Sequence, residues 1–230
     1  RDRPTLCPED GFVVGDGERI LAFGMAELSP GAGTGAIQAL IVDPGCQRRG
    51  IGSDLLGRLE ERARRAGRED CAVSTGLYRF WSGIPEDLPR AAGFFERHGY
   101  ARAHGAIDMY APLGAFAVEE TCRERFRRLG ITVTNALARG VRAAGDFIAR
   151  EQPSWSESFS TVAAAGDAEH VLLLTHGDEI VGVVQTFAPR SIFRGANLVH
   201  ETVYGRDMGG FGAVLIAKAW RGKGLGSGMI

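Results

Sequence analysis

Residues 42–56 of the chain read VDPGCQRRGIGSDLL. An apolar strand end leads through a Pro-Gly turn and two arginines into Gly50 and Gly52, and apolar residues at helical spacing then continue to residue 66. The first turn of a helix has backbone N–H groups without internal partners and carries the positive end of the helix dipole. Because glycines let an anion approach the backbone, the stretch predicts a phosphate-binding turn between a strand and a helix.

The same pattern occurs a second time. Residues 216–230 read IAKAWRGKGLGSGMI, and an alignment without gaps places Gly224 on Gly50 and Gly226 on Gly52. A single glycine turn is weak evidence of a phosphate site, since glycine marks many turns. Its repetition indicates a tandem protein built from two related units.

The segments before the two glycine loops agree as well. Residues 11–28 and 170–187 each carry a Gly/Asp turn between two apolar, β-prone runs, which predicts a β-hairpin. A further strand is predicted at 36–42 in the first copy and at 213–216 in the second.

The remaining segments differ between the copies. After its loop and helix, the first copy predicts a strand at 71–77, a helix at 88–99 and one or two final strands in 100–113. Before its hairpin, the second copy predicts a strand and an amphipathic helix within 130–153, and another helix within 154–166.

These segments set the expected domain boundaries. We expect a first unit at 1–115 that lacks its N-terminal strand and helices, a connector at 116–129, and a second unit at 130–230 that lacks its C-terminal half. We therefore expect the sequence to be an internal piece, or an incompletely recorded stretch, of a longer tandem protein. The alternative is a genuine 230-residue chain with one complete and one vestigial unit.

Composition narrows the function classes. Hydrophobic residues make up 44% of the chain, as in an ordinary globular protein. The net charge of −1 provides no electrostatic attraction to nucleic acid or to an anionic membrane. No apolar run is long enough to cross a bilayer. The four cysteines form no CxxC pair and the five histidines show no metal-ligand spacing. We expect a cytoplasmic protein without a metal.

The motifs carry a family resemblance. VDPGCQRRGIGSDLL and the later AAGFFERHGY resemble the acyl-CoA-binding motif and the following helix of the GNAT superfamily of N-acyltransferases, and IAKAWRGKGLG resembles the same motif. The resemblance spans nearly the whole chain apart from a charged stretch at 119–128. It implies an α/β (α+β) protein with tandem GNAT-like domains, each a mixed, splayed β-sheet flanked by helices.

The resemblance also implies a ligand and its site. Acetyl-CoA or a related acyl-CoA is the expected co-substrate, lying in the cleft between the fourth and fifth strands of a unit. There a strand backbone pairs with the pantetheine arm and a loop holds the pyrophosphate. The residues that match these roles are Leu40, Ile41, Val42, Gln47, Arg48, Arg49, Gly50, Ile51 and Gly52 in the first unit, and Leu215, Ile216, Arg221, Gly222, Lys223, Gly224, Leu225 and Gly226 in the second.

The catalytic pattern of the family is less complete. Direct transfer to an amine needs a base, and the departing thiolate benefits from an acid. Gln38 stands where many GNAT enzymes have a glutamate, and Phe95 stands where they have a tyrosine. The candidates from elsewhere in the chain are Glu27, Tyr100, Glu201 and Tyr204.

The expected function is transfer of an acetyl group from acetyl-CoA to a primary amine of a small molecule or peptide, directly within a ternary complex. The alternative is a catalytically degenerate acyl-CoA-binding or regulatory module, which Gln38 and Phe95 favour. A third reading, transfer from an aminoacyl-tRNA, fits the near-neutral charge poorly. The acceptor, the active unit and the choice between monomer and homodimer stay open.

Overall fold

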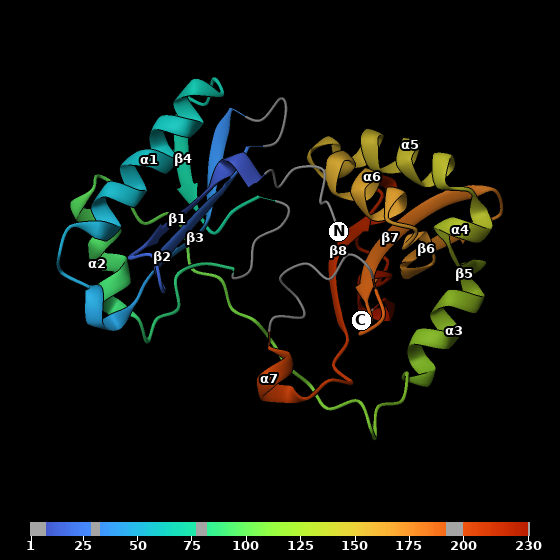
Figure 1. Ribbon diagram of the computed structural model, residues 1–230. Helices are drawn as coiled ribbons and strands as arrows, with labels where there is room; N and C mark the ends of the chain where they lie inside the picture. The colour runs from blue at the N-terminus through green and yellow to red at the C-terminus, as the bar shows by residue number, and fades with distance from the viewer. Residues whose placement is uncertain (1–7, 29–32, 77–81, 192–199, 230) are drawn as a thin grey trace. The chain divides into compact units, whose positions relative to one another are not determined.

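The computed structural model describes residues 8–28, 33–76, 82–191 and 200–229. The chain divides into two compact units, Arg1–Met109 and Tyr110–Ile230, and each has its own four-stranded sheet with helices packed on it (Figure 1). Among the described residues, no helix is long and apolar enough to cross a membrane.

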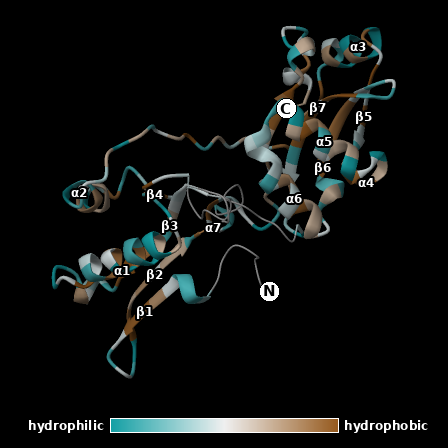
Figure 2. Ribbon diagram, turned by 90° about the horizontal axis from the view of Figure 1, so that it is seen from above, coloured by the Kyte–Doolittle hydropathy of each residue, from teal (hydrophilic) through white to brown (hydrophobic). Residues whose placement is uncertain are grey.

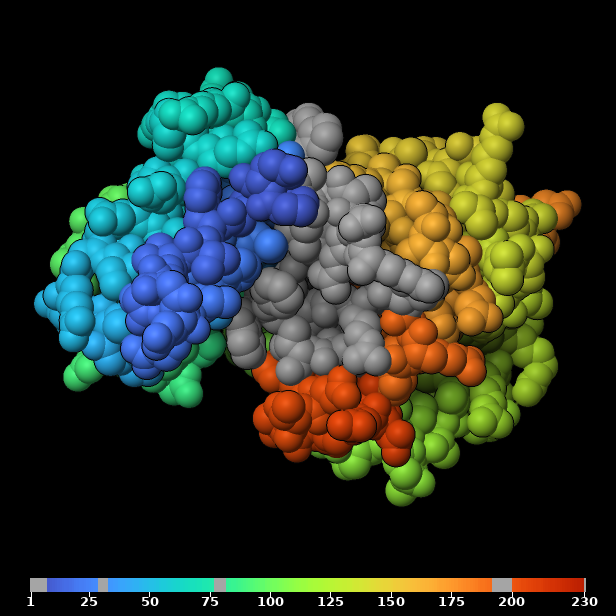
Figure 3. Space-filling view, viewed as in Figure 1, coloured from blue at the N-terminus to red at the C-terminus, as the bar shows by residue number. Residues whose placement is uncertain are grey.

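The sheet of the first unit is mixed. It has the order β1-β2-β3-β4, in which the first three strands are antiparallel and β4 runs parallel to β3. The strands are β1 (Gly11–Gly15), β2 (Ile20–Glu27), β3 (Thr34–Val42) and β4 (Asp70–Val73), and a 3₁₀ turn, η1 (Pro8–Asp10), precedes them. The predicted hairpin at 11–28 is thus confirmed. It lies on the surface of this unit, in dark blue in Figure 3.

Helix α1 (Ile51–Arg65) packs along β2 and β3 through the apolar stripe that its spacing predicts. Leu55, Leu56 and Leu59 are buried, while the cationic and acidic residues cover the outer face, seen as the teal side of α1 in Figure 2. A Cβ at Gly24 of β2 would lie 3.0 Å from Leu55 and Leu59 side-chain atoms, so glycine there permits the close helix–strand contact. Helix α2 (Pro89–Arg97) adds Phe95 to the same core.

The sheet of the second unit has the order β5-β6-β7-β8, with antiparallel pairing throughout the described residues. Its core is formed mainly by the apolar strands β6 and β7, with Leu173 and Val181 fully buried. The strands are β5 (Ile131–Asn135), β6 (Val171–His176), β7 (Glu179–Phe187) and β8 (Gly210–Ile216). The helices are α3 (Glu120–Arg128), α4 (Ala136–Arg139), α5 (Val141–Glu151), α6 (Ser156–Ala164) and α7 (Glu201–Tyr204), with 3₁₀ turns η3 (Pro153–Trp155) and η4 (Ala168–His170).

The structure corrects two secondary-structure predictions. Residues 101–113 form no strand and are exposed, with Ile107 and Met109 each 89% exposed. A β-prone run becomes a strand only where a neighbouring edge pairs with it, and Gly105 and Pro112 further interrupt this run. The single helix expected after β5 is divided at Gly140, whose φ of 108° ends α4 before α5 begins.

The charged stretch at 119–128 is also ordered. It forms α3, which packs against β5 and lies within the second unit. The boundary between the units falls in the extended segment around Met109 and Tyr110.

Candidate functional site

The two glycine loops are built in the same way. Each follows a 3₁₀ turn, η2 (Pro44–Cys46) or η6 (Lys218–Trp220), that begins where β3 or β8 ends. Gln47 Nε2 donates a hydrogen bond to the Val42 carbonyl at 3.1 Å, and Arg221 Nε donates to the Ile216 carbonyl at 3.0 Å. Each side chain thereby ties the loop back to the last residue of its strand.

The backbone of the two loops matches as well. Arg48 and Gly50 have φ values of 62° and 86°, and the aligned Gly222 and Gly224 have values of 75° and 72°. Two left-handed residues with one residue between them turn the chain sharply away from the strand. Such turns expose successive backbone N–H groups to a common point, which is the chemistry of an anion-binding loop.

In the first unit this loop opens directly into α1. The N-cap residue Gly50 has no side chain that could cap the first turn of α1. The space beside its Cα is open, because a Cβ built there would meet no described heavy atom within 4 Å. The first-turn N–H groups have no acceptor within the helix, and the exposed side chains of Arg48 and Arg49 lie beside them in the sequence. This donor set fits a pyrophosphate.

Helix α2 contributes a group that the sequence motif does not reveal. His98 Nδ1 lies 2.9 Å from the Phe94 carbonyl, and His98 Nε2 lies 3.0 Å from Ser53 Oγ in the first turn of α1. Because a carbonyl only accepts, Nδ1 carries the proton, and in the neutral ring Nε2 accepts from the Ser53 hydroxyl. His98 thus fixes the amino end of α1 against α2.

The second loop differs in what covers it. Arg125 Nη1, from α3, donates to the Gly224 carbonyl at 3.2 Å, and a Cβ at Gly224 would lie 2.8 Å from that nitrogen. Leu225 is buried with Phe126 packed against its cluster, whereas the aligned Ile51 is only half-buried. The described continuation after this loop is the short turn η7 (Gly226–Gly228).

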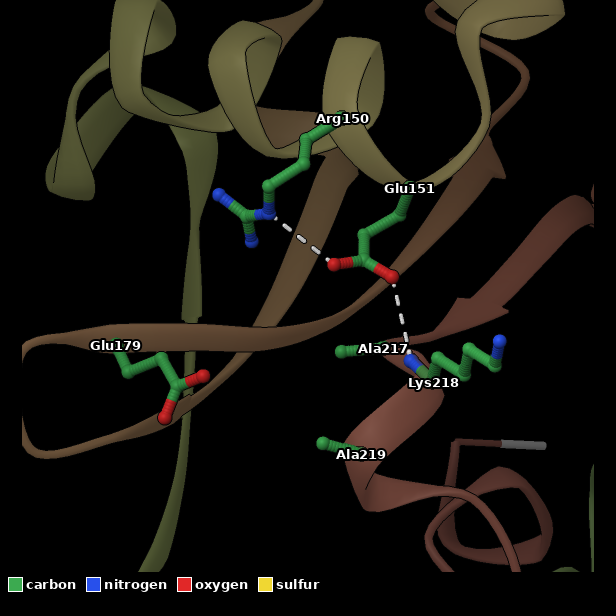
Figure 4. A pocket seen from close by; sticks show the side chains of 6 residues that line it. All are labelled: Arg150, Glu151, Glu179, Ala217, Lys218 and Ala219. Atoms are coloured by element: carbon green, nitrogen blue, oxygen red, sulfur yellow. Dashed lines mark hydrogen bonds and ion pairs between the residues drawn. The ribbon is translucent and has the colours of Figure 1, made fainter.

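A shallow hollow of about 580 Å³ lies beside this second loop (Figure 4). Its lining comes from α5, β7 and η6: Arg150, Glu151, Glu179, Ala217, Lys218 and Ala219. Glu151 accepts from the Lys218 backbone N–H at 3.2 Å and from Arg150 Nε at 3.1 Å. Both carboxylate oxygens are engaged, so Glu151 anchors the start of η6 to α5.

The sheet of the first unit opens beside its loop. Strand β3 pairs with β4 only from Thr34 to Ile37, and the last bond runs from the Ser74 N–H to the Ile37 carbonyl at 2.9 Å. Beyond this point Leu40–Val42 remain paired with β2 alone among the described residues. Beyond its last pair with β4, this edge of β3 has no paired strand among the residues that the structure describes, at the end that leads to the glycine loop.

A buried polar pair lies where the strands separate. The register of β2 and β3 shifts between Met25 and Ala26, so Gln38 is the extra residue of a β-bulge. Gln38 and Glu27, the last residue of β2, are each 3% exposed. Gln38 Nε2 donates to Glu27 Oε2 at 2.8 Å and to the Thr75 carbonyl at 2.5 Å. One amide therefore joins β2, β3 and the segment after β4.

The same place in the second unit has different chemistry. The register of β7 and β8 also shifts, and Ala213 has a φ of 52° at the irregularity. The last residue of β7, however, is the buried Phe187 in place of Glu27. Gln185 is buried nearby, and its Nε2 has no hydrogen-bond partner within the part of the chain that the structure describes.

Tyr100 and Phe95 lie in the packing between α1 and α2. The Tyr100 hydroxyl donates to Glu60 Oε1 at 2.9 Å, and the ring contacts Phe95 edge-on. Burial and the neighbouring Glu60 carboxylate raise the pKa of Tyr100 above its ordinary value. Burial likewise raises the pKa of the adjacent Cys71 thiol. Phe95 is a core residue packed with Leu56 and Leu59.

The two candidates on α7 lie in a separate cluster of the second unit. The Tyr204 ring stacks on Tyr110 with centroids 4.0 Å apart, and His200 contacts it edge-on. Glu201 Oε1 lies 4.0 Å from Arg206 Nε. The structure brings Glu27 together with Gln38, whereas the Tyr100 hydroxyl is bonded to Glu60.

Comparison with known proteins agrees with this geometry. Residues 8–102 match the family model described as the acetyltransferase (GNAT) domain. The first unit is therefore a GNAT acetyltransferase domain. The chain is 38% identical over 101 residues to a mycothiol acetyltransferase of Geodermatophilus obscurus and 35% identical over 114 residues to one of Thermomonospora curvata. These matches cover 44% and 49% of this chain but only 29% and 31% of the relatives, so the chain spans about a third of their length.

Solved structures extend the likeness to both units. A glucosamine N-acetyltransferase region of a fungal multi-domain GH3 β-N-acetylglucosaminidase superposes on 93% of this chain, with a TM-score of 0.80 at 20% identity, over 27% of that chain. A tandem GNAT protein of the clavulanic acid pathway superposes on 98% of this chain and 68% of its own, with a TM-score of 0.59 at 18% identity. The two units together thus have a tandem GNAT fold.

Proposed function

We propose that the first unit transfers an acetyl group from acetyl-CoA to a primary amine. The observation that carries the proposal is the glycine loop of a GNAT domain, with left-handed Arg48 and Gly50, which follows the part of β3 that has separated from β4. In this assignment residues 47–52 bind the pyrophosphate and the free edge at Leu40–Val42 pairs with the pantetheine arm.

Glu27 is the base in this proposal. Its carboxylate takes a proton from the acceptor's ammonium group, and the freed nitrogen attacks the thioester carbonyl carbon. Collapse of the tetrahedral adduct breaks the C–S bond. The CoA thiolate takes up the second proton that the nitrogen loses, and Glu27 returns its own proton to solvent. A backbone N–H of β3 near the bulge polarises the thioester carbonyl.

The first unit is favoured over the second for two reasons. Phe187 stands at the strand end that Glu27 occupies in the first unit, and Phe187 cannot accept a proton. In addition, Arg125 and Phe126 pack against the second loop, whereas the first is exposed. The second loop, with Arg221–Gly226 and Leu215–Ile216, is then an auxiliary acyl-CoA site or a structural element.

The acceptor in this proposal is an amine of a small molecule or peptide. The curated relatives are named for mycothiol, so the unacetylated form of mycothiol belongs in the first panel of acceptors together with amino sugars and peptide amino termini.

The test is release of free CoA thiol from acetyl-CoA, measured for the whole chain with each amine. We expect amine-dependent turnover that Glu27→Gln lowers at least tenfold and Arg49→Ala weakens through a higher KM for acetyl-CoA. Loss of turnover in Lys223→Ala but not in Arg49→Ala would move the active site to the second unit.

A second function has its own support. Phe95 is buried in the core where the family resemblance places a tyrosine acid, which favours an acyl-CoA-binding module without turnover. Saturable acetyl-CoA binding with no amine-dependent release of thiol across the panel would establish this alternative.

A further inference from the structure

We infer that Gln38 is the docking and positioning residue for the acceptor nitrogen, and that it selects an acceptor carrying N–H groups in the charged, ammonium form. The inference rests on the proposed function, because it assigns the amine site of the same unit. The observation that supports it is that the oxygen of the buried Gln38 amide has no hydrogen-bond partner among the described residues.

The orientation of that amide is fixed by its neighbours. Gln38 Nε2 lies 2.8 Å from Glu27 Oε2 and 2.5 Å from the Thr75 carbonyl oxygen. A carbonyl can only accept, and so can an ionised carboxylate, so both atoms require the amide nitrogen. The reversed amide would place oxygen against oxygen twice. The two N–H groups are therefore used, and Oε1 faces elsewhere.

Gln38 Oε1 is buried and has no hydrogen-bond partner among the residues that the structure describes. The whole residue is only 3% exposed. Leaving a buried acceptor without a donor is energetically unfavourable, so such atoms are rare in folded proteins and mark places where a ligand or water completes the bonding. A donor must therefore be supplied when the site is in use.

The missing donor is best supplied by an ammonium group. The nitrogen and oxygen of one amide are separated by roughly 2.3 Å, so Gln38 Oε1 lies within about 5 Å of Glu27 Oε2. When Glu27 accepts the amide N–H on the same side as Oε1, the two oxygens lie closer than this limit, and one nitrogen that makes hydrogen bonds of about 2.9 Å can bridge them. A buried carboxylate beside a neutral oxygen acceptor favours a cation with N–H groups over a neutral ligand.

The position suits the reaction. Gln38 is the bulge residue of β3, immediately beyond the last β3–β4 pair and two residues before Leu40. A nitrogen held there lies beside the free edge of β3 that we assign to the thioester arm. Gln38 Oε1 would hold the nitrogen while Glu27 removes its proton, which separates positioning from proton transfer.

The test uses methylammonium as the probe and follows the side-chain amide signals of ¹⁵N-glutamine-labelled protein. We expect saturable shifts of the Gln38 signal on addition of methylammonium and none with tetramethylammonium, which has the charge but no N–H. Gln38→Met should abolish the binding. The matched control is Gln185→Met, which removes a buried amide from the other sheet and should leave methylammonium binding unchanged.

Kinetics give the second readout. We expect Gln38→Met to raise the KM for the amine roughly tenfold to a hundredfold, the worth of a hydrogen bond to a charged group, without changing acetyl-CoA affinity. Equal shifts with both ammonium ions, or an unchanged amine KM in a folded Gln38→Met protein, would overturn the inference. Because methylammonium binding needs no turnover, its presence in a protein that fails to transfer acetyl groups would refute the proposed function alone. If Gln38→Met does not fold, the comparison of the two ammonium ions in the unaltered protein decides.

Discussion

Gln47 and Arg221 make the same hydrogen bond in two different units of the chain. Each donates from its side chain to the carbonyl five residues earlier, Gln47 to Val42 and Arg221 to Ile216, at 3.1 and 3.0 Å. A neutral amide and a guanidinium thus perform one structural task, which is to fold a glycine loop back on the end of its strand. The duplication therefore extends beyond the glycines to the support of the loop.

The left-handed backbone at Gly50 predicts the effect of a small substitution. Gly50→Ala adds a Cβ at a φ of 86°, which costs about 1–2 kcal/mol, and lowers acetyl-CoA affinity roughly tenfold as the loop relaxes. Calorimetric titration measures the affinity. The control is Gly57→Ala on the exposed face of α1, which should stabilise the protein by about 0.5–1 kcal/mol and leave affinity unchanged. Equal affinity in both variants would contradict the role of Gly50.

Gly76 gives a test of the Glu27 site that leaves Glu27 in place. A Cβ at Gly76 would lie 2.7 Å from Glu27 Oε2 and 2.9 Å from Gln38 Nε2, and φ is 83°. We expect Gly76→Ala to displace the carboxylate and lower kcat at least tenfold, since a misplaced base loses much of its effect. Acetyl-CoA affinity should not change. Gly83→Ala, where a Cβ meets no described atom within 4 Å, should retain full kcat; an unaltered kcat in Gly76→Ala would argue against Glu27 as the base.

Leu59 tests the packing that holds α1, and with it the glycine loop, on the sheet. Its side chain is fully buried, and Leu59→Ala should lower the free energy of unfolding by about 2–5 kcal/mol. Ile20, in the same unit, is 68% exposed, and Ile20→Ala should change the free energy by less than about 0.5 kcal/mol. Urea unfolding followed by circular dichroism makes the comparison. Equal losses would show that α1 does not pack on the sheet as described.

Glu151 predicts a pH dependence at the second loop. The hydrogen bond from the Lys218 backbone N–H lowers the pKa of Glu151 below its usual range, and the hydrogen bond from the Arg150 side chain lowers it further. A lowered pKa in the folded state stabilises the protein above the unfolded value of about 4.3, and this contribution is lost as pH falls through the folded value. The Lys218 amide shift, followed by NMR from pH 6 downward, should report that loss. In Glu151→Gln the amide shift should not titrate, and a similar titration there would exclude Glu151 as its source.

Local patterns in the sequence predict much of the first unit. The hairpin at 11–28, the strand ending at Val42 and the helix from Ile51 each depend on alternation, turn residues or helical spacing that lie close together in the chain. The break at Gly140 depends on one backbone angle, and the absence of strands in 101–113 depends on whether a distant edge is available. Neither is encoded in a short window.

The catalytic chemistry illustrates the same limit. From the sequence alone, Gln38 is interpreted as the loss of a catalytic glutamate. The β-bulge that brings Gln38 to Glu27 cannot be predicted from the sequence pattern. The covering of the second loop by Arg125 also requires tertiary packing, since the two partners are far apart in the chain. In contrast, the loop itself is readable because its glycines and their spacing specify the backbone directly.

The most direct measurement is calorimetric titration of the whole chain with acetyl-CoA, repeated for Gly50→Ala and Gly224→Ala. We predict saturable binding with a Kd in the range of roughly 1 μM to 1 mM, weakened by the change at Gly50 and not by the change at Gly224. Absence of binding at millimolar acetyl-CoA, or binding that only Gly224→Ala weakens, would contradict an acyl-CoA site in the first unit.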